Sequence, residues 1–132
     1  MQTPSIFTKI VRGEIPSHKI YEDEHTYAFL DIHPTTESHT LVIPKKQVES
    51  VWDLDDTEYD ALMTTVKKIA LHLREVTEVA YVGVKIIGTD VPHAHVHLIP
   101  FDTAAQFNHS SPTDTEPNHD ALAALAERLR LD

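Results

Sequence analysis

The chain has 132 residues and a mass of 14.9 kDa, so we expect a single domain over residues 1–132 without a separate cofactor-binding domain. Its 21 acidic residues outnumber 11 basic ones, and the formal net charge of -10 argues against a nucleic-acid binder, which needs positive charge over its footprint. The absence of cysteine excludes disulfides, cysteine-bound zinc and thiol nucleophiles, which draws attention to the ten histidines.

The N-terminal third of the chain predicts a short helix followed by three strands. Ile6, Phe7 and Ile10 recur at helical spacing, and Gly13 follows them as a glycine beyond a helix end would. Segments rich in apolar and β-branched residues then predict strands, of which the first two form a hairpin and the third ends at Pro44. The expected strands cover residues 18–21, 26–32 and 39–43.

The apolar period changes to three or four residues after Asp55, which is typical of an amphipathic helix. Asp55 and Asp56 supply the cap oxygen and the negative charge that suit its N-terminus. Further along we expect a helix over residues 56–76, strands over 80–87 and 94–99, a mobile loop over 102–119 and a C-terminal helix over 120–131. With a core over about residues 5–101, the pattern indicates the α+β class, an antiparallel sheet of about five strands with helices packed on one face.

Three histidines in alternation, His93, His95 and His97, form the sharpest motif of the chain. On an extended strand their side chains point to one face, while the intervening apolar residues face the core. Such a run is costly to keep for packing alone, and a functional role is therefore expected. Metal binding is one alternative, with His93 and His95 as a chelating pair. It leaves the third histidine unexplained, since Cα atoms four residues apart on a strand are separated by about 13 Å.

Covalent catalysis at phosphorus fits all three histidines better. The central ring, His95, would attack the phosphorus, and its neighbours would hold oxygens of the same group. A nucleophilic imidazole must be neutral, with its proton on the nitrogen that does not attack. That nitrogen therefore needs an acceptor, such as a backbone carbonyl group.

The triad and several N-terminal segments together resemble one known family. The similarity, in order and spacing, is to the histidine triad nucleotide-binding branch of the HIT superfamily of nucleotide hydrolases and transferases. It extends over about residues 5–101 and rests on residues 5–10, 13–16, 21–23, 28–32, 34, 39–45 and 93–99. The resemblance implies a HIT-like fold and a two-fold homodimer that joins two sheets edge to edge, with the long helix near the axis.

The resemblance also implies roles for individual residues. His95 would be the nucleophile that forms a nucleotidyl-imidazole intermediate, and His97 would contact the phosphate oxygens. His93 would orient the centre through hydrogen bonds, with His39 as a supporting fourth histidine behind the triad. Asp31 would accept hydrogen bonds from the ribose hydroxyls, and a carboxylate is indeed an efficient acceptor for a vicinal diol. The presence of His97 favours hydrolases over the uridylyltransferase branch, in which glutamine takes this place.

Five apolar residues would sandwich the purine base by the same resemblance. They are Ile6, Phe7, Ile10, Phe29 and Ile32. Apolar walls with few polar groups suit a nucleotide pocket. The alternative for each of them is ordinary core packing.

Two departures from the family pattern affect the site. Many bacterial relatives have cysteines where this chain has Ser5 and Thr8, and with the residues matching His39 and His93 those cysteines hold a structural zinc. We therefore expect no metal. Asp90 falls in a shortened loop, near where an uncharged residue usually touches the phosphate. A carboxylate there would repel a phosphate dianion, so either Asp90 turns away or the leaving group is cationic or amine-like.

The hypothesis is a cofactor-free hydrolase that cleaves purine nucleoside 5'-phosphoramidates or related conjugates through a nucleotidyl-histidine intermediate. The alternative is a nucleotide- or partner-binding module with little turnover, and a weaker one is a metal hydrolase that uses His93 and His95. The expected partners are a small purine nucleotide and a second copy of the chain, with no nucleic acid and no membrane. We expect a cytoplasmic protein, since no apolar run approaches the roughly 20 residues of a membrane span.

Overall fold

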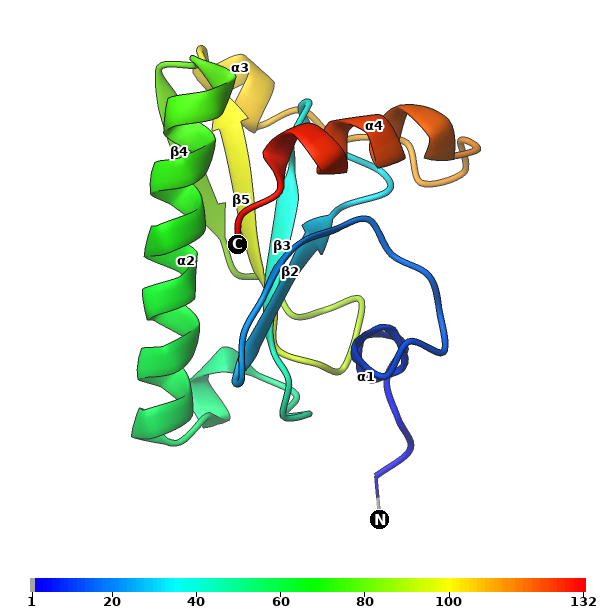
Figure 1. Cartoon of the computed structure of the whole chain (residues 1–132), viewed down its shortest axis with the longest axis vertical. Helices are drawn as coiled ribbons and strands as arrows, with labels where there is room; N and C mark the ends of the chain where they lie inside the picture. Colours follow the sequence, from blue (N-terminus) through cyan, green and yellow to red (C-terminus); the bar gives the residue numbers. More distant parts are fainter. Residues whose placement is uncertain (1) are drawn as a thin grey trace.

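The computed structural model of the protein describes residues 2–132 (Figure 1). The N-terminal part contains α1 (Ile6–Val11), β1 (Lys19–Glu22), β2 (Thr26–Leu30), β3 (Thr40–Pro44) and the 3-10 helix η1 (Val51–Asp53). The remainder contains α2 (Asp56–Thr77), β4 (Tyr81–Lys85), β5 (Val96–Phe101), α3 (Ala104–Phe107) and α4 (His119–Leu129). No helix among the described residues combines the length and the apolarity needed to cross a bilayer.

The strands form one sheet in the order β1-β2-β3-β5-β4, and all neighbours are antiparallel. The predicted α+β class and the five-stranded antiparallel sheet are therefore confirmed. Within the sheet, β5 lies between β3 and β4, and His97 is paired with Leu41 on one side and with Lys85 on the other. This register brings residues from distant parts of the chain to the same place as the histidine motif.

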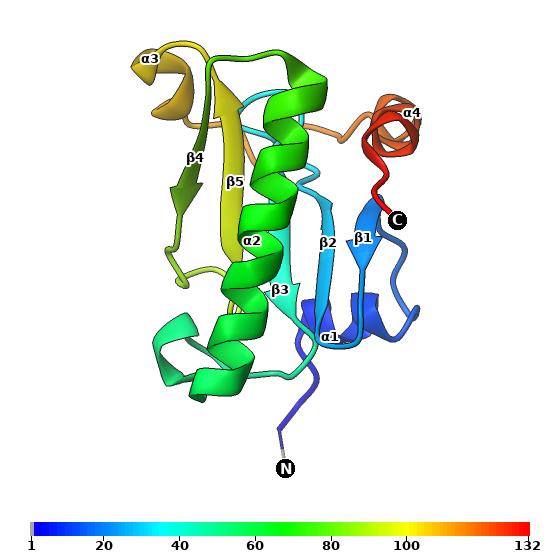
Figure 2. The same cartoon turned by 60° about the vertical axis from the view of Figure 1, so that its left-hand side comes forward.

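The helices cover both faces of the sheet, whereas the sequence predicted one covered face. Figure 2 shows α2 lying across the sheet, where Leu62 and Ile69 pack against Val42 of β3 in the larger core cluster. The α1 residue Phe7 packs instead against Phe29 and neighbouring residues in a second cluster. Alternate residues of β2 and β3 belong to the two clusters, so these lie on opposite faces. Both strands are consequently buried at every position.

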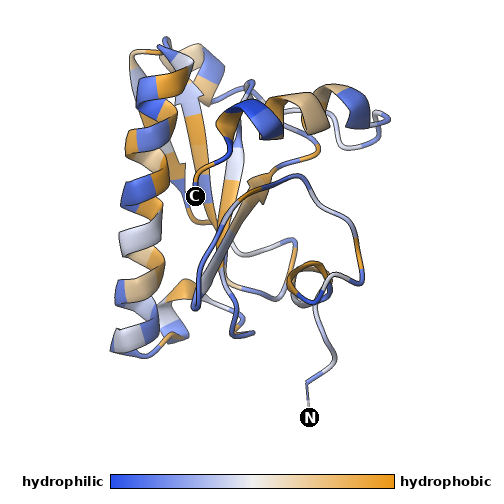
Figure 3. Cartoon of the chain, viewed as in Figure 1, coloured by the Kyte–Doolittle hydropathy of each residue, from blue (hydrophilic) through white to orange (hydrophobic). Residues whose placement is uncertain are grey.

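The long helix α2 agrees closely with its prediction. Its first turn is capped by Asp55, whose side chain accepts a hydrogen bond from the Glu58 backbone amide. Its ribbon alternates between hydrophobic and hydrophilic stretches in Figure 3, as expected of an amphipathic helix. It ends at Glu78, which adopts a left-handed conformation with φ 59°.

The C-terminal region differs from its prediction in one respect. The segment expected to be a loop over residues 102–119 contains the short helix α3, which Thr103 and Gln106 cap reciprocally. The Phe107 ring of this helix lies directly against Gly83 of β4, where a Cβ atom would collide with it. Helix α4 follows as predicted, and Leu122 and Leu129 are among its buried residues.

Candidate functional site

The three histidines lie at the start of β5, and only His97 belongs to the strand. The prediction of an extended strand through the whole motif is therefore wrong for His93 and His95. The chain bends before β5, where the His93 backbone amide donates to the Val91 carbonyl group at 2.8 Å. The Ala94 amide donates to Val48 at 2.7 Å and not to a neighbouring strand. Even so, the His95 and His97 rings are adjacent, with centroids 5.1 Å apart.

His93 is completely buried, and both of its ring nitrogens are engaged. Its Nε2 atom lies 2.8 Å from the carbonyl oxygen of Pro44, and its Nδ1 atom lies 2.8 Å from the Ser5 hydroxyl group. The network thus assigns the proton to Nε2 and leaves Nδ1 as an acceptor. Burial lowers the pKa of His93, which favours this neutral form. A chelating pair of His93 and His95 is disfavoured, since His93 has no free nitrogen.

His95 presents a free lone pair. Its Nδ1 atom lies 2.7 Å from the carbonyl oxygen of His93, which can only accept, so Nδ1 holds the proton. This contact is the backbone acceptor that the sequence argument required. The Nε2 atom is buried and has no hydrogen-bond partner among the described residues. A neutral imidazole held in this tautomer is the form that attacks an electrophile.

His97 presents the complementary group, a free N–H donor. The Thr35 backbone amide donates to Nδ1 of His39 at 2.9 Å, so the His39 proton resides on Nε2. That Nε2–H group donates to Nδ1 of His97 at 3.0 Å, which places the His97 proton on its own Nε2. This Nε2 atom is also buried and without a partner in the described part of the chain. Beside the lone pair of His95 there is therefore a hydrogen-bond donor.

Burial keeps this donor uncharged near neutral pH. The pKa of His39 is lowered to about 3 and that of His97 to about 4, mainly by burial. The neighbouring histidine, His97 or His95 respectively, and the positive charge of Lys85 act in the same direction, whereas Asp90 raises the pKa of His97. Lys85 lies beside His97 in the sheet, with its ammonium group 3.1 Å from the Phe107 carbonyl oxygen, which accepts its hydrogen bond. His97 thus contributes a neutral N–H group to the site.

Asp31 follows β2 and lies next to His39 and His97. Its Oδ1 atom accepts a hydrogen bond from the His33 amide at 2.8 Å, and Oδ2 is 3.5 Å from Nε2 of His39. Burial raises the pKa of Asp31. Ligand atoms of Asp31, His39 and His97 lie within 4.8 Å of one another, a distance that suits a metal ion. The Thr35 amide, however, fixes the proton of His39 on the very nitrogen that would bind the ion, so hydrogen bonding accounts better for this cluster.

Asp90 faces the free nitrogen of His95. Its Oδ1 atom is 3.2 Å from Nε2 of His95, and its side chain is 64% exposed. In the assigned tautomer that nitrogen has no proton, so the contact is not a hydrogen bond. The sequence left two possibilities, that Asp90 turns away or that the leaving group is cationic or amine-like, and in the structure Asp90 does not turn away from His95.

The five apolar residues proposed for the base divide into two groups. Phe7, Ile10 and Phe29 are buried in the second core cluster, which favours core packing for them. The Phe7 ring contacts His95 edge-on, with ring centroids 5.1 Å apart, and so packs against the His95 ring. Ile6 and Ile32 are 49% and 41% exposed and remain available to a ligand.

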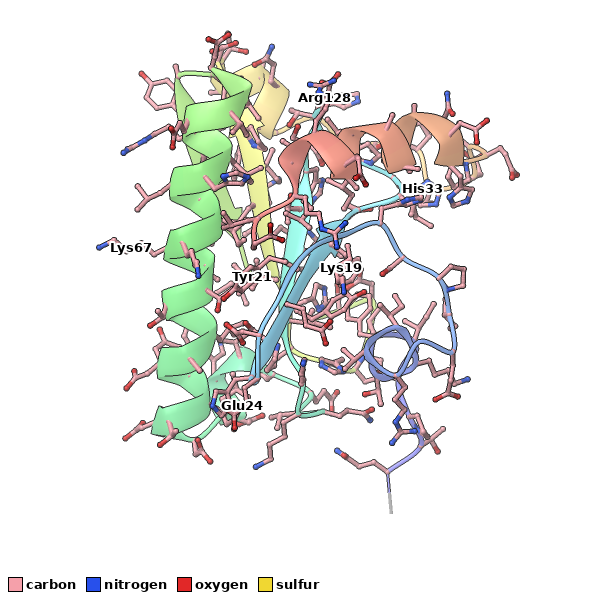
Figure 4. The ribbon with its side chains drawn as sticks, in the orientation of Figure 1. Lys19, Tyr21, Glu24, His33, Lys67 and Arg128 are labelled. Carbon is pink, nitrogen blue, oxygen red and sulfur yellow. The ribbon has the colours of Figure 1, made fainter. Side chains whose placement is uncertain are left out.

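A large cavity borders this site without containing the triad. It has a volume of about 740 Å³ and lies between the segment after β2 and helix α4, with Asp31, Ile32 and His39 among its lining residues. Figure 4 labels His33 beside α4 and Arg128 on it, which both line the cavity. We place the chemistry at the histidines, because the unpartnered buried nitrogens lie there.

The structural zinc site implied by the resemblance is replaced by a hydrogen-bonded cluster. Ser5 and Thr8 lie 2.8 and 3.3 Å from Nδ1 of His93, and the Thr8 hydroxyl donates to Gln47 at 2.6 Å. The resemblance implied His39 as the fourth member of this cluster. His39 contacts His97 instead, and Gln47 joins Ser5, Thr8 and His93 in its place. Two hydroxyl groups and an amide are poor zinc ligands, so these residues do not fit that metal.

Three contributors to the site were not identified from the sequence. Thr35 acts through its backbone amide, so its residue type contains no signal. Gln47 acts in a cluster whose members are far apart in the sequence. Lys85 could be found only with the register between β4 and β5, which places it beside His97.

Comparison with known proteins agrees with this geometry. A family model described as HIT domain matches residues 12–104. An uncharacterized HIT-like protein of Borreliella burgdorferi is 42% identical over 72% of this chain and 73% of its own length. An adenosine 5'-monophosphoramidase of Candida albicans is 35% identical over 95% of this chain and 88% of its own. The crystal structure of a HIT-like protein from Bartonella henselae has a TM-score of 0.81 at 31% identity, covering 98% of this chain and 96% of that one.

Proposed function

Because this chain belongs to the HIT domain family, we propose that it is a nucleotide hydrolase that cleaves purine nucleoside 5'-phosphoramidates or related nucleotide conjugates. The observation that carries the proposal is the pair of free, buried nitrogens, a lone pair on His95 and an N–H donor on His97. The name of the Candida albicans relative supports the substrate class. The protein acts as a cytoplasmic homodimer in this proposal.

The reaction proceeds in two displacements. In the first, Nε2 of His95 attacks the α-phosphorus, the N–P bond forms, and the bond to the leaving group breaks with its electron pair. The His97 Nε2–H group donates to a phosphoryl oxygen and stabilises the charge that develops there. Water then attacks the nucleotidyl-histidine and releases the nucleoside monophosphate. Splitting one difficult displacement in two lowers the barrier of each step.

The surrounding residues hold the two reacting histidines in place. The His93 carbonyl oxygen accepts a hydrogen bond from Nδ1–H of His95 and stabilises the positive charge that arises on the ring when Nε2 binds phosphorus. His39 fixes the orientation of His97. Asp31 would accept hydrogen bonds from the ribose hydroxyls, and the exposed side chains of Ile6 and Ile32 would contact the base.

Replacement of His95 tests the proposal. His95→Ala is expected to abolish hydrolysis of adenosine 5'-phosphoramidate while AMP binding, measured by calorimetry, stays nearly unchanged. His39→Ala should lose only about 10- to 100-fold in rate, because it acts through His97. A slow substrate should leave a nucleotidyl adduct on the peptide containing His95, located by mass spectrometry. An adduct elsewhere, or AMP binding by the wild-type protein without turnover, would refute the hydrolase and support the binding module.

A further inference from the structure

We propose that Asp90 determines specificity for the leaving group, favouring nucleotide conjugates whose leaving group is a cationic amine and disfavouring those whose leaving group is anionic. This inference rests on the proposed function and deepens it. Its basis is the position of the Asp90 carboxylate, 3.2 Å from the nitrogen that attacks phosphorus. A carboxylate so close to the reaction centre interacts with every charge that enters or leaves it.

The sides of the His95 ring that the protein covers, and the side that it leaves open, indicate where the leaving group lies. The His93 carbonyl oxygen accepts a hydrogen bond from Nδ1 of His95, on the side of the ring away from Nε2, and the Phe7 ring packs against another side. The ring itself is 1% exposed, whereas the Asp90 side chain is 64% exposed and lies on the open side. An entering phosphoryl group must take the place next to Nε2, so the Asp90 side chain rotates toward solvent. There it meets the group that departs opposite the attacking nitrogen.

The remaining charges of the site do not neutralise Asp90. His39 and His97 are neutral at pH 7, since burial lowers their pKa values to about 3 and about 4. Asp31 adds a second carboxylate. The ammonium group of Lys85 is bound to the Phe107 carbonyl oxygen and lies over the Phe107 ring. A substrate with additional phosphates on the leaving side would therefore meet uncompensated negative charge.

A carboxylate in this position favours cleavage of a phosphoramidate. Its P–N bond breaks readily once the nitrogen has taken up a proton from the solvent, because the amine then departs as a neutral molecule. Asp90 stabilises that protonated nitrogen as well as a distant ammonium group on the same amine. When His95 attacks, the N–P bond to His95 forms, the P–N bond to the amine breaks, and the electron pair stays on the amine. No oxidant, reductant or metal enters this balance.

A matched set of substrates tests the inference. Adenosine 5'-monophosphate linked through nitrogen to 1,3-diaminopropane, to butylamine or to 4-aminobutyrate presents a cationic, a neutral or an anionic leaving group of similar length. The measured quantity is the ratio of kcat/KM for the cationic to that for the anionic substrate. An exposed ion pair changes an affinity by up to about fivefold, and attraction and repulsion act together, so we expect a wild-type ratio of about tenfold. It should fall at high salt.

Asp90→Asn removes the charge while keeping the shape, and it should bring the ratio close to one. Asp114→Asn makes the same change of net charge at an exposed residue outside the site and should leave the ratio at its wild-type value. An unchanged ratio in Asp90→Asn would overturn the inference. Rates with the neutral butylamine substrate test the hydrolase proposal separately, since its leaving group has no distant charge.

The binding version of the experiment does not depend on turnover. Dissociation constants of the cationic and anionic conjugates are measured on His95→Ala protein with Asp90 intact or replaced by Asn. A preference for the cationic conjugate that disappears with Asp90→Asn supports the inference even if the wild-type protein hydrolyses nothing. Equal dissociation constants in the presence of Asp90 refute it.

Discussion

At His95 and His39, a backbone group determines which ring nitrogen holds the proton. The His93 carbonyl oxygen holds the proton of His95 on Nδ1, and the Thr35 amide determines the tautomer of His39. His39 in turn determines the tautomer of His97. Hydrogen bonds from backbone groups and from His39 thus determine the tautomers that place a lone pair beside a donor, because a carbonyl can only accept and an amide can only donate.

The role of Asp31 is open to a direct test with two sugars. Asp31→Ala should weaken AMP binding much more than binding of 2'-deoxy-AMP, because the deoxy sugar lacks one hydroxyl of the diol. The charge-assisted hydrogen bond is worth roughly 1.5 to 3 kcal/mol, or about 10- to 150-fold in affinity. Calorimetric titration of both nucleotides measures the difference. Equal losses for both sugars would mean that Asp31 acts through folding or through its charge.

The buried neutral histidines make stability depend on pH. Burial lowers the pKa values of His39 and His97 from 6.5 to about 3 and about 4, so between these values and 6.5 the unfolded chain binds more protons than the folded one. The free energy of unfolding therefore falls as the pH drops from about 6.5 to about 4. The raised pKa of Asp31 acts in the opposite sense and reduces the fall.

We expect a loss of up to about 6 kcal/mol between pH 7 and pH 4, about 3 kcal/mol from each histidine, measured by urea unfolding at several pH values. His97→Gln removes one of the titrating groups and should flatten this dependence. His25→Gln, at an exposed histidine, should leave the slope as it is in the wild type. A wild-type protein equally stable at pH 7 and pH 4 would contradict the assigned neutral forms.

At the scale of elements, the start of α1 and the bend before β5 form one structural unit. Ser5 caps α1 by accepting a hydrogen bond from the Thr8 amide, and its hydroxyl group also lies 2.8 Å from His93. The His93 ring then reaches the Pro44 carbonyl group at the end of β3. The helix, the strand end and the bend are thereby joined through His93, two residues before His95.

This unit predicts the metal content of the protein. The wild-type chain should contain no stoichiometric zinc, because Ser5 and Thr8 are weak ligands. The double substitution Ser5→Cys with Thr8→Cys places two thiolates beside Nδ1 of His93 and should create a zinc site. Elemental analysis and the rise of the melting temperature on zinc addition measure it, and a further His93→Gln change should abolish the gain. One zinc per wild-type chain would show that the cluster has been misjudged.

At the scale of the whole molecule, the sheet has an exposed apolar edge strand at β4. Strand β4 is at the end of the strand order, and Tyr81, Val84 and Ile87 along it and just beyond it are exposed. An exposed apolar edge strand is normally paired or covered. The proposed homodimer, which joins two sheets edge to edge, would cover these side chains.

Sedimentation at micromolar protein concentration should accordingly give the mass of a dimer. Val84→Arg puts a charge on the β4 edge and is expected to shift the equilibrium toward monomer, because burying an unpaired charge at an interface is unfavourable. Lys67→Arg, at an exposed position of α2, keeps its charge and serves as a control. A monomeric wild-type mass would exclude the edge-to-edge dimer.

The sequence by itself determined the features that depend on local patterns. The period and caps of α2, the hairpin of β1 and β2 and the histidine motif follow from spacing and residue type, which act over a few neighbouring residues. Tertiary structure alone decided the placement of α1 on the second face, the contact of His39 with His97, and Gln47 in the cluster where His39 was expected. It also decided that Asp90 faces Nε2 of His95. These contacts join residues far apart in the chain or run through backbone carbonyl and amide groups, which every residue type presents alike, so their partners are defined only once the sheet has formed.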